Sequence, residues 1–158
     1  MKRQNGFTMV ELITVMVLLG VLAAIGVPRL MGDNGTGAVV FGDQVKSALR
    51  LAHKNAVARR RVVCVQAAGT TVSIRIRQAP GLGACDNAML DGLPDAGFAS
   101  NSNKLTVANA PATLFFRPDG TVSDSAAGTP LGRTELHILA SGAIERSIAL
   151  QGSTGHVE

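Results

Sequence analysis

The chain begins with a long apolar segment that contains a single charged residue. Between Phe7 and Val27 the only ionisable side chain is that of Glu11. About 20 consecutive apolar residues are what a helix needs to cross a bilayer, so the pattern predicts a membrane helix over residues 7–31. A carboxylate inside such a helix costs about 2.5–3.5 kcal/mol on insertion scales. Glu11 therefore needs an explanation that a simple anchor does not supply.

A second helical pattern follows a glycine-rich break. Residues 32–37 read Gly-Asp-Asn-Gly-Thr-Gly, which predicts a kink or local melting of the helix. From residue 39 to residue 61 apolar positions recur at spacings of three and four, which predicts an amphipathic helix lying against a sheet. The predicted buried stripe consists of Phe41, Val45, Ala48, Leu49, Ala52 and Ala56.

Residues 62–158 show the alternation and turn signals of a β-rich domain. Most of residues 79–104 are rich in Gly, Pro, Asn and Asp, which predicts a long irregular segment. Pro118-Asp119-Gly120 predicts a turn, and Ser141-Gly142 predicts the tip of a hairpin. The overall prediction is an α+β fold with a small antiparallel sheet. The predicted strands are Val62–Gln66, Thr70–Arg77, Leu105–Val107, Thr113–Arg117, Glu135–Ala140 and Ala143–Leu150.

The residues before the apolar segment suggest a role for Glu11. Lys2 and Arg3 form a short basic head, and Gly6 provides a small junction just before Phe7. If the chain were cut after Gly6, the new amine of Phe7 would lie one helical turn from Glu11. A paired charge in a helix bundle is far less costly than an unpaired one. We therefore hypothesise that cleavage makes Glu11 a device for aligning helices, through its own amine or that of a neighbouring subunit.

The motif Gly6, Phe7, Thr8 and Glu11, followed by the apolar helix, resembles the class III signal of type IV pilins and pseudopilins. The resemblance implies that a prepilin peptidase cleaves between Gly6 and Phe7 and methylates the amine of Phe7. It also implies that Phe7 and Glu11 are the assembly residues. A pilin fold would then have a leader over 1–6, a membrane and assembly helix over 7–31, a glycine break with an amphipathic helix half over 32–61, and a periplasmic head over 62–158.

Two simpler interpretations of the N-terminal segment remain. A secretory signal peptide would have a shorter apolar core and would poorly tolerate a central Glu. A plain transmembrane anchor has a suitable length but leaves Glu11 unexplained. The basic residues Lys2 and Arg3 place the N-terminus in the cytoplasm under the positive-inside rule, so the head would face the periplasm.

The middle of the chain resembles the GspH/FimT class of minor pilins. Ala56, Val57, Arg59 and Cys64 match the helix end and first strand of that class, and residues 114–121 match a strand leading into a Pro-x-Gly turn. The resemblance implies an H-type subunit of the inner membrane and then of a pilus or pseudopilus. Its partners would be other pilins or pseudopilins, the prepilin peptidase and the inner-membrane assembly platform. Type II secretion, type IV pilus and mannose-sensitive pilus systems share these features.

The two cysteines, Cys64 and Cys85, have two interpretations. In an oxidising periplasm a disulfide is the default, and closing this loop would stabilise the fold by roughly 3 kcal/mol in the chain-entropy model. The alternative is a pair of buried free thiols. No Cys-x-x-Cys motif is present to indicate redox or zinc chemistry.

DNA is an alternative partner. Some minor pilins of the GspH/FimT class resemble DNA receptors for natural transformation, which use a C-terminal Gly-Arg-x-Arg stretch. The corresponding residues here are Gly155-His156-Val157-Glu158. A carboxylate there would repel phosphate. The remaining basic candidates are Arg59, Arg60, Arg61, Arg75 and Arg77. The basic triplet Arg59-Arg60-Arg61 lies at a predicted helix end, where cations would complement the helix dipole. The chain has no Trp or Tyr to stack bases.

No pattern indicates an enzyme. His53, His137 and His156 are isolated in the sequence and lack the spacing of a helical metal site, so no metal or other cofactor is predicted. His137 alternates with Leu136 and Ile138, which predicts an outward-facing residue on a strand. The net charge of +4 includes Lys2 and Arg3, so the rest of the chain is only mildly basic. A structural subunit is the prediction.

Overall fold

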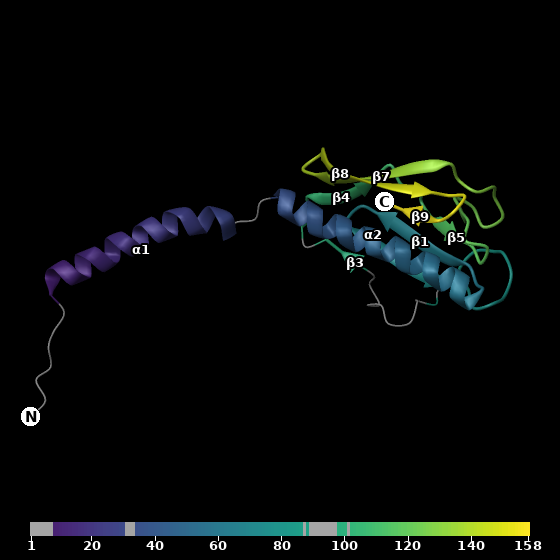
Figure 1. Ribbon diagram of the computed structural model, residues 1–158, viewed down its shortest axis with the longest axis horizontal. Coiled ribbons are helices and arrows are strands. Elements are labelled where there is room, and N and C mark those ends of the chain that lie inside the picture. The colour runs from purple at the N-terminus through teal and green to yellow at the C-terminus, as the bar shows by residue number, and fades with distance from the viewer. Residues whose placement is uncertain (1–7, 31–33, 87, 89–97, 101) are drawn as a thin grey trace, which may run out of the picture. The chain divides into compact units, whose positions relative to one another are not determined.

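Two long helices precede a set of short strands (Figure 1). The computed structural model describes residues 8–30, 34–86, 88, 98–100 and 102–158. Helix α1 spans Met9–Leu30 and helix α2 spans Asn34–Arg59. The chain divides into two compact units, Met1–Asp33 and Asn34–Glu158. We refer to the second unit as the head.

The described strands of the head form two antiparallel sheets. One has the order β3-β2-β1-β5-β6 and the other the order β4-β7-β8-β9. The α+β fold with an antiparallel head is confirmed, with its strands divided between two sheets. The strands are β1 (Val63–Ala68), β2 (Thr71–Ile76), β3 (Phe98–Ala99), β4 (Leu105–Ala108), β5 (Leu114–Phe116), β6 (Val122–Ser123), β7 (Arg133–Ala140), β8 (Ala143–Gln151) and β9 (His156–Val157).

The long hairpin of the second sheet forms as its sequence predicts. Strands β7 and β8 are joined by Ser141 and Gly142, which have φ angles of 52° and 88°. Two consecutive positive φ values are typical of the tight turn whose twist matches a hairpin. His137 faces outward between buried Leu136 and Ile138, as predicted, and its Nδ1 lies 3.0 Å from the Oγ of Ser147 across the hairpin.

The predicted Pro118-Asp119-Gly120 turn is also present. Gly120 has a φ of 86°, and its N–H donates to the carbonyl of Arg117 at 3.0 Å. One oxygen of Asp119 accepts from both the hydroxyl and the N–H of Thr121, at 2.7 and 2.9 Å. The hydrogen bond from the Thr121 hydroxyl is the largest of the causes that hold the pKa of the Asp119 carboxyl below its ordinary value.

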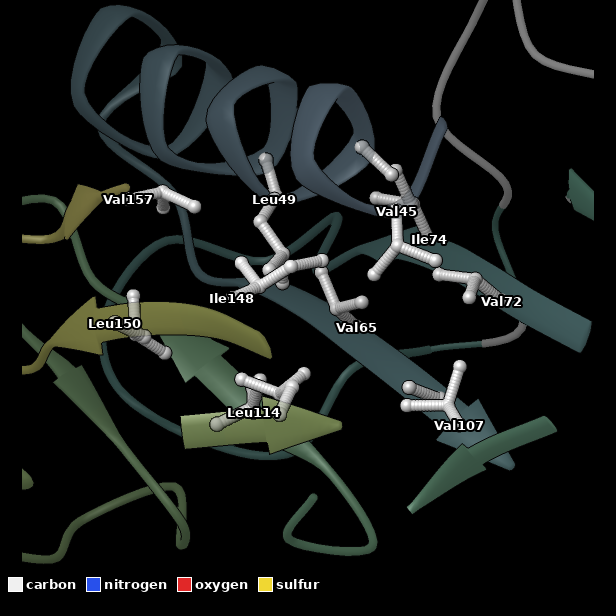
Figure 2. Close-up of a cluster of buried hydrophobic side chains, with 14 of the residues drawn as sticks. Val45, Leu49, Val65, Val72, Ile74, Val107, Leu114, Ile148, Leu150 and Val157 are labelled. Atoms are coloured by element: carbon white, nitrogen blue, oxygen red, sulfur yellow. The ribbon is translucent and has the colours of Figure 1, made fainter. Parts of the chain in front are cut away.

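The core of the head lies between α2 and the two sheets. Figure 2 shows Val45 and Leu49 directed from the helix toward side chains of β1, β2 and β8, including Val65, Ile74 and Ile148. Every residue of the predicted helical stripe is at most 2% exposed. Burial of this stripe supplies the main stabilisation of α2, at about 25 cal/mol for each Å² of apolar surface removed from water.

The second helix begins earlier than predicted, while the first lies within its predicted range. Helix α2 begins at Asn34, so Gly35 and Gly37 lie inside it and not in a break. A Cβ on Gly37 would lie 3.3 Å from the Cδ1 of Leu105, so glycine lets the helix approach β4 closely. Helix α1 continues through Pro28 to Leu30. Residues 32 and 33 of the predicted break lie outside the described residues.

Candidate assembly helix and basic surfaces

The first turn of α1 is closed by a threonine cap. The hydroxyl of Thr8 accepts the N–H of Glu11 at 3.3 Å, and its carbonyl accepts the N–H of Leu12 at 3.2 Å. Thr-x-x-Glu is the capping-box sequence, in which the acidic residue also complements the helix dipole. Thr8 therefore caps the backbone of Glu11, whose carboxylate lies in the first helical turn, and the Thr-x-x-Glu spacing is the sequence signal for this cap. Gly6 and Phe7 lie outside the described residues.

Helix α1 exposes apolar side chains on all of its faces. Between Met9 and Ile25 every large apolar side chain is exposed, from 48% for Val15 to 83% for Met9. A helix that is apolar all round is normally covered by protein or lipid. Within the described residues, no helix combines the length and the apolar character that crossing a membrane requires.

The two cysteines are joined. Cys64 on β1 and Cys85 form a disulfide, with their Cα atoms 6.0 Å apart. Cys64 pairs in register with Arg75 on one side and Phe115 on the other. The bridge therefore ties the segment after β2 to a central strand of the first sheet. The N–H of Ile76 donates to the carbonyl of Ala88 at 3.0 Å, which holds the same segment further along.

The basic triplet begins where α2 ends. Arg60 has a φ of 51°, its N–H donates to the carbonyl of Val57 at 3.4 Å, and the N–H of Arg61 donates to that of Ala56 at 3.2 Å. This pair of hydrogen bonds is the Schellman pattern, in which the left-handed position is usually glycine. The backbone of Arg60 therefore serves to terminate the helix, a role for which its side chain is not needed.

The other residues that were predicted to bind nucleic acid contact parts of the head itself. A guanidinium nitrogen of Arg61 donates to the carbonyl of Gln78. Arg75 and Arg77 are half-buried on β2 and just after it, and Gly83 packs against the guanidinium of Arg77. The structure thus places Arg61 and Arg77 beside the segment that follows β2, while Arg59 and Arg60 stay exposed at the helix end. Of these five residues only Arg59 and Arg60 are exposed.

A separate basic hollow lies between α2 and the C-terminal turn, which comprises residues 152–155. It measures about 490 Å³ and is lined by Arg50, His53, Lys54, Thr154, Gly155, His156 and Val157. We call it the basic hollow. The sequence prediction missed it because its two walls lie about 100 residues apart in the chain. Only the spacing of Arg50, His53 and Lys54, which places them on one helical face, could have indicated it.

Hydrogen bonds hold both walls of the basic hollow. A guanidinium nitrogen of Arg50 donates to the carbonyl of Val157 at 2.9 Å. The Nε2 of His53 lies 3.2 Å from the carbonyl oxygen of Gly120, and its ring packs edge-on to Phe116 with centroids 6.4 Å apart. His53, on α2, thus lies against both the Pro118-Asp119-Gly120 turn and Gly155 of the C-terminal turn.

The described residues contain no group of three or more His, Cys, Asp or Glu side chains that could hold a metal ion. His156 instead lies 3.5 Å from a carboxylate oxygen of Glu158, which also faces Arg133 at 3.9 Å. These ion pairs are exposed, so they contribute little to stability.

Comparisons with known proteins match both ends of the chain. Residues 1–27 match the model of the prokaryotic N-terminal methylation motif, and residues 42–154 match the model of the type II transport protein GspH. A type II secretion system core protein G of Klebsiella pneumoniae is 58% identical over 34 residues, which are 22% of this chain and 24% of that protein. The chain thus spans about a quarter of the length of this relative.

Two longer matches are to proteins of Pseudomonas aeruginosa. A fimbrial protein is 28% identical over 114 residues, which cover 72% of this chain and 70% of that protein. A crystal structure of the type IV minor pilin FimU aligns with 78% of this chain and 89% of its own, at 21% identity and a TM-score of 0.47. The GspH model matches residues 42–154, well over half of this chain, so the chain belongs to the GspH family of type II transport proteins.

Proposed function

We propose that this chain is an H-type minor pilin or pseudopilin that joins the tip or priming complex of a type II secretion pseudopilus or a type IV pilus. Membership of the GspH family makes it a structural subunit and not an enzyme. The observation that carries the proposal is α1, which exposes every large apolar side chain from Met9 to Ile25. A helix of this kind needs a cover, and packed helices of neighbouring subunits would provide one.

The proposal includes processing before assembly. The match to the methylation motif over residues 1–27 supports cleavage between Gly6 and Phe7, followed by methylation of the new amine. The basic residues Lys2 and Arg3 favour a precursor held at the inner membrane with its N-terminus in the cytoplasm. The amine of Phe7 would then pair with Glu11 of the same or a neighbouring subunit.

The contacts of the basic residues weaken the DNA-receptor alternative. Arg61 is engaged with the carbonyl of Gln78, and Glu158 places a carboxylate beside His156. A phosphate backbone would have to pass this carboxylate. No described contact favours DNA over a protein partner.

Mass spectrometry of the chain isolated from fibres tests the proposal. The full chain is expressed in a host with and without its prepilin peptidase, and the surface fibres are sheared off and purified. We expect fibres from the complete host to contain the chain without residues 1–6 and with one added methyl group. A chain that keeps its leader, or that is absent from the fibres although the major subunit is present, would overturn the proposal.

A further inference from the structure

We propose that the basic hollow binds a carboxylate side chain in the head of a neighbouring pilin or pseudopilin subunit. The inference rests on the proposed function and names the chemistry of one contact within it. The hollow, of about 490 Å³, presents Arg50, His53, Lys54 and His156, and none of the described residues that line it is acidic. Its shape and its charge therefore favour a small anionic group.

Among the described residues, two cations of the hollow lack the ion-pair partner that Arg146 and Arg133 have elsewhere in the head. Arg146 lies 2.7 Å from Asp43, and Arg133 lies 3.9 Å from Glu158. Across the part of the head that the structure describes, Arg50 and Lys54 form no ion pair. Two neighbouring cations without a counter-charge repel each other, and a carboxylate from outside would relieve that repulsion.

The walls of the hollow are set before any ligand arrives. The hydrogen bond from Arg50 to the carbonyl of Val157 fixes one side. Gly155 packs so tightly against His53 that an added Cβ would lie 2.3 Å from the Cδ2 of that ring. A site that is already ordered loses less conformational entropy on binding. Lys54 makes no described hydrogen bond, so its ammonium is available to a partner.

The observations favour a protein carboxylate over a nucleic acid. A duplex carries one negative charge per about 1.7 Å, so its recognition needs a track of cations and not one compact hollow. The carboxylate of Glu158, 3.5 Å from His156, interrupts any such track at the rim. The chain also has no Trp or Tyr on which unpaired bases could stack. Glu158 is not among the residues that line the hollow, and Lys54 is.

Carbodiimide coupling tests this contact directly, because it joins a lysine amine to a carboxylate only when the two touch. Sheared fibres that contain the full chain are treated with a water-soluble carbodiimide, digested and examined by mass spectrometry. We expect an amide between Lys54 and an Asp or Glu of another subunit. Lys54→Arg should abolish this product, because arginine keeps the charge but offers no amine to the carbodiimide.

Charge reversal supplies the matched control. Lys54→Glu should lower the amount of chain in fibres about five- to tenfold, because like charges across an interface are strongly disfavoured. Lys104→Glu makes the same charge change at an exposed residue outside the hollow and should leave the amount unchanged. Chain present in fibres without a Lys54 amide to another subunit, or equal effects of the two reversals, would overturn the inference and leave the proposed function standing.

Two other results would also overturn the inference. Wild-type chain absent from the fibres would defeat the proposed function and this contact together. Full chain that retains a labelled duplex DNA, and loses it on Lys54→Glu but not on Lys104→Glu, would assign the hollow to nucleic acid.

Discussion

Gly155 holds the C-terminal turn against His53 in a backbone conformation that alanine adopts poorly. Its φ is 67°, and a Cβ at this position would lie 2.3 Å from the Cδ2 of His53 and 2.7 Å from the carbonyl oxygen of Gly120. Gly69 offers a matched control, with a φ of 56° and nothing within 4 Å of an added Cβ. The two glycines therefore share the backbone cost of Gly→Ala, but only Gly155 adds a collision.

The magnitudes follow from these two contributions. An L-residue in the left-handed region costs about 1–2 kcal/mol, so Gly69→Ala should destabilise the head by about that amount. Overpacking typically adds about 1–3 kcal/mol, so Gly155→Ala should cost about 2–5 kcal/mol. The His53 ring could move away, but it would give up its contact with the Gly120 carbonyl.

Urea unfolding of the head, residues 34–158, measures both free energies. Circular dichroism is the suitable signal because the chain has neither Trp nor Tyr for fluorescence. We expect the midpoint to fall clearly further for Gly155→Ala than for Gly69→Ala, with unchanged slopes. Equal losses in the two variants would refute the packing of the C-terminal turn against His53.

Three further predictions concern the head. Arg60→Gly should raise the free energy of unfolding by about 1 kcal/mol, because glycine suits the left-handed position at the helix end. Arg59→Gly, inside α2, should lower it by up to about 1 kcal/mol, and the urea midpoints of both variants check this. Replacing Cys64 and Cys85 by Ser should lower the free energy of unfolding by about 3 kcal/mol, and a melting temperature unchanged from the oxidised wild type would contradict it. Because the pKa of Asp119 is lowered in the fold, its stabilisation is present above the ordinary pKa and is lost as pH falls through the folded value. The free energy of unfolding of Asp119→Asn should therefore fall less than that of the wild type between about pH 7 and about pH 2. Equal losses in the two proteins, measured by urea unfolding at both pH values, would contradict this.

The core of the head was largely predictable from the sequence because its patterns are local. The stripe from Phe41 to Ala56 follows the helical period, and the hairpin of β7 and β8 is marked by Ser141-Gly142. Each of these signals lies within a few residues of the structure that it specifies. The helix, the hairpin and the buried face were therefore found.

The features that escaped prediction depend on contacts between distant segments. Strands β3, β6 and β9 have two residues each, too few to show a period, and neighbouring strands define them. Gly37 lies inside α2, where its close approach to Leu105 accompanies a low helix propensity that the sequence pattern alone weighs against a helix. The basic hollow joins residues of α2 to the C-terminal turn, so the spacing of Arg50, His53 and Lys54 marks only its helical wall.

The interpretation of Glu11 gained a second component from the structure. The sequence predicts a carboxylate in an apolar helix, and the structure shows a cap in which the hydroxyl of Thr8 accepts the N–H of Glu11. A loss of assembly in Glu11→Ala would not isolate the charge, since alanine removes the carboxylate together with the rest of the side chain but keeps the N–H that Thr8 accepts. Gln is also accepted at this position of a capping box, so Glu11→Gln removes only the charge.

The most direct test of the account is the amount of mature chain in sheared fibres for Glu11→Gln beside Thr8→Ala. We expect Glu11→Gln to be processed but incorporated at least about tenfold less, because the amine of Phe7 would be left without its partner in the packed helices. Thr8→Ala should assemble nearly normally, because losing a cap costs only about 1 kcal/mol. Normal incorporation of Glu11→Gln, or an equal defect in Thr8→Ala, would contradict Glu11 as the charged assembly residue.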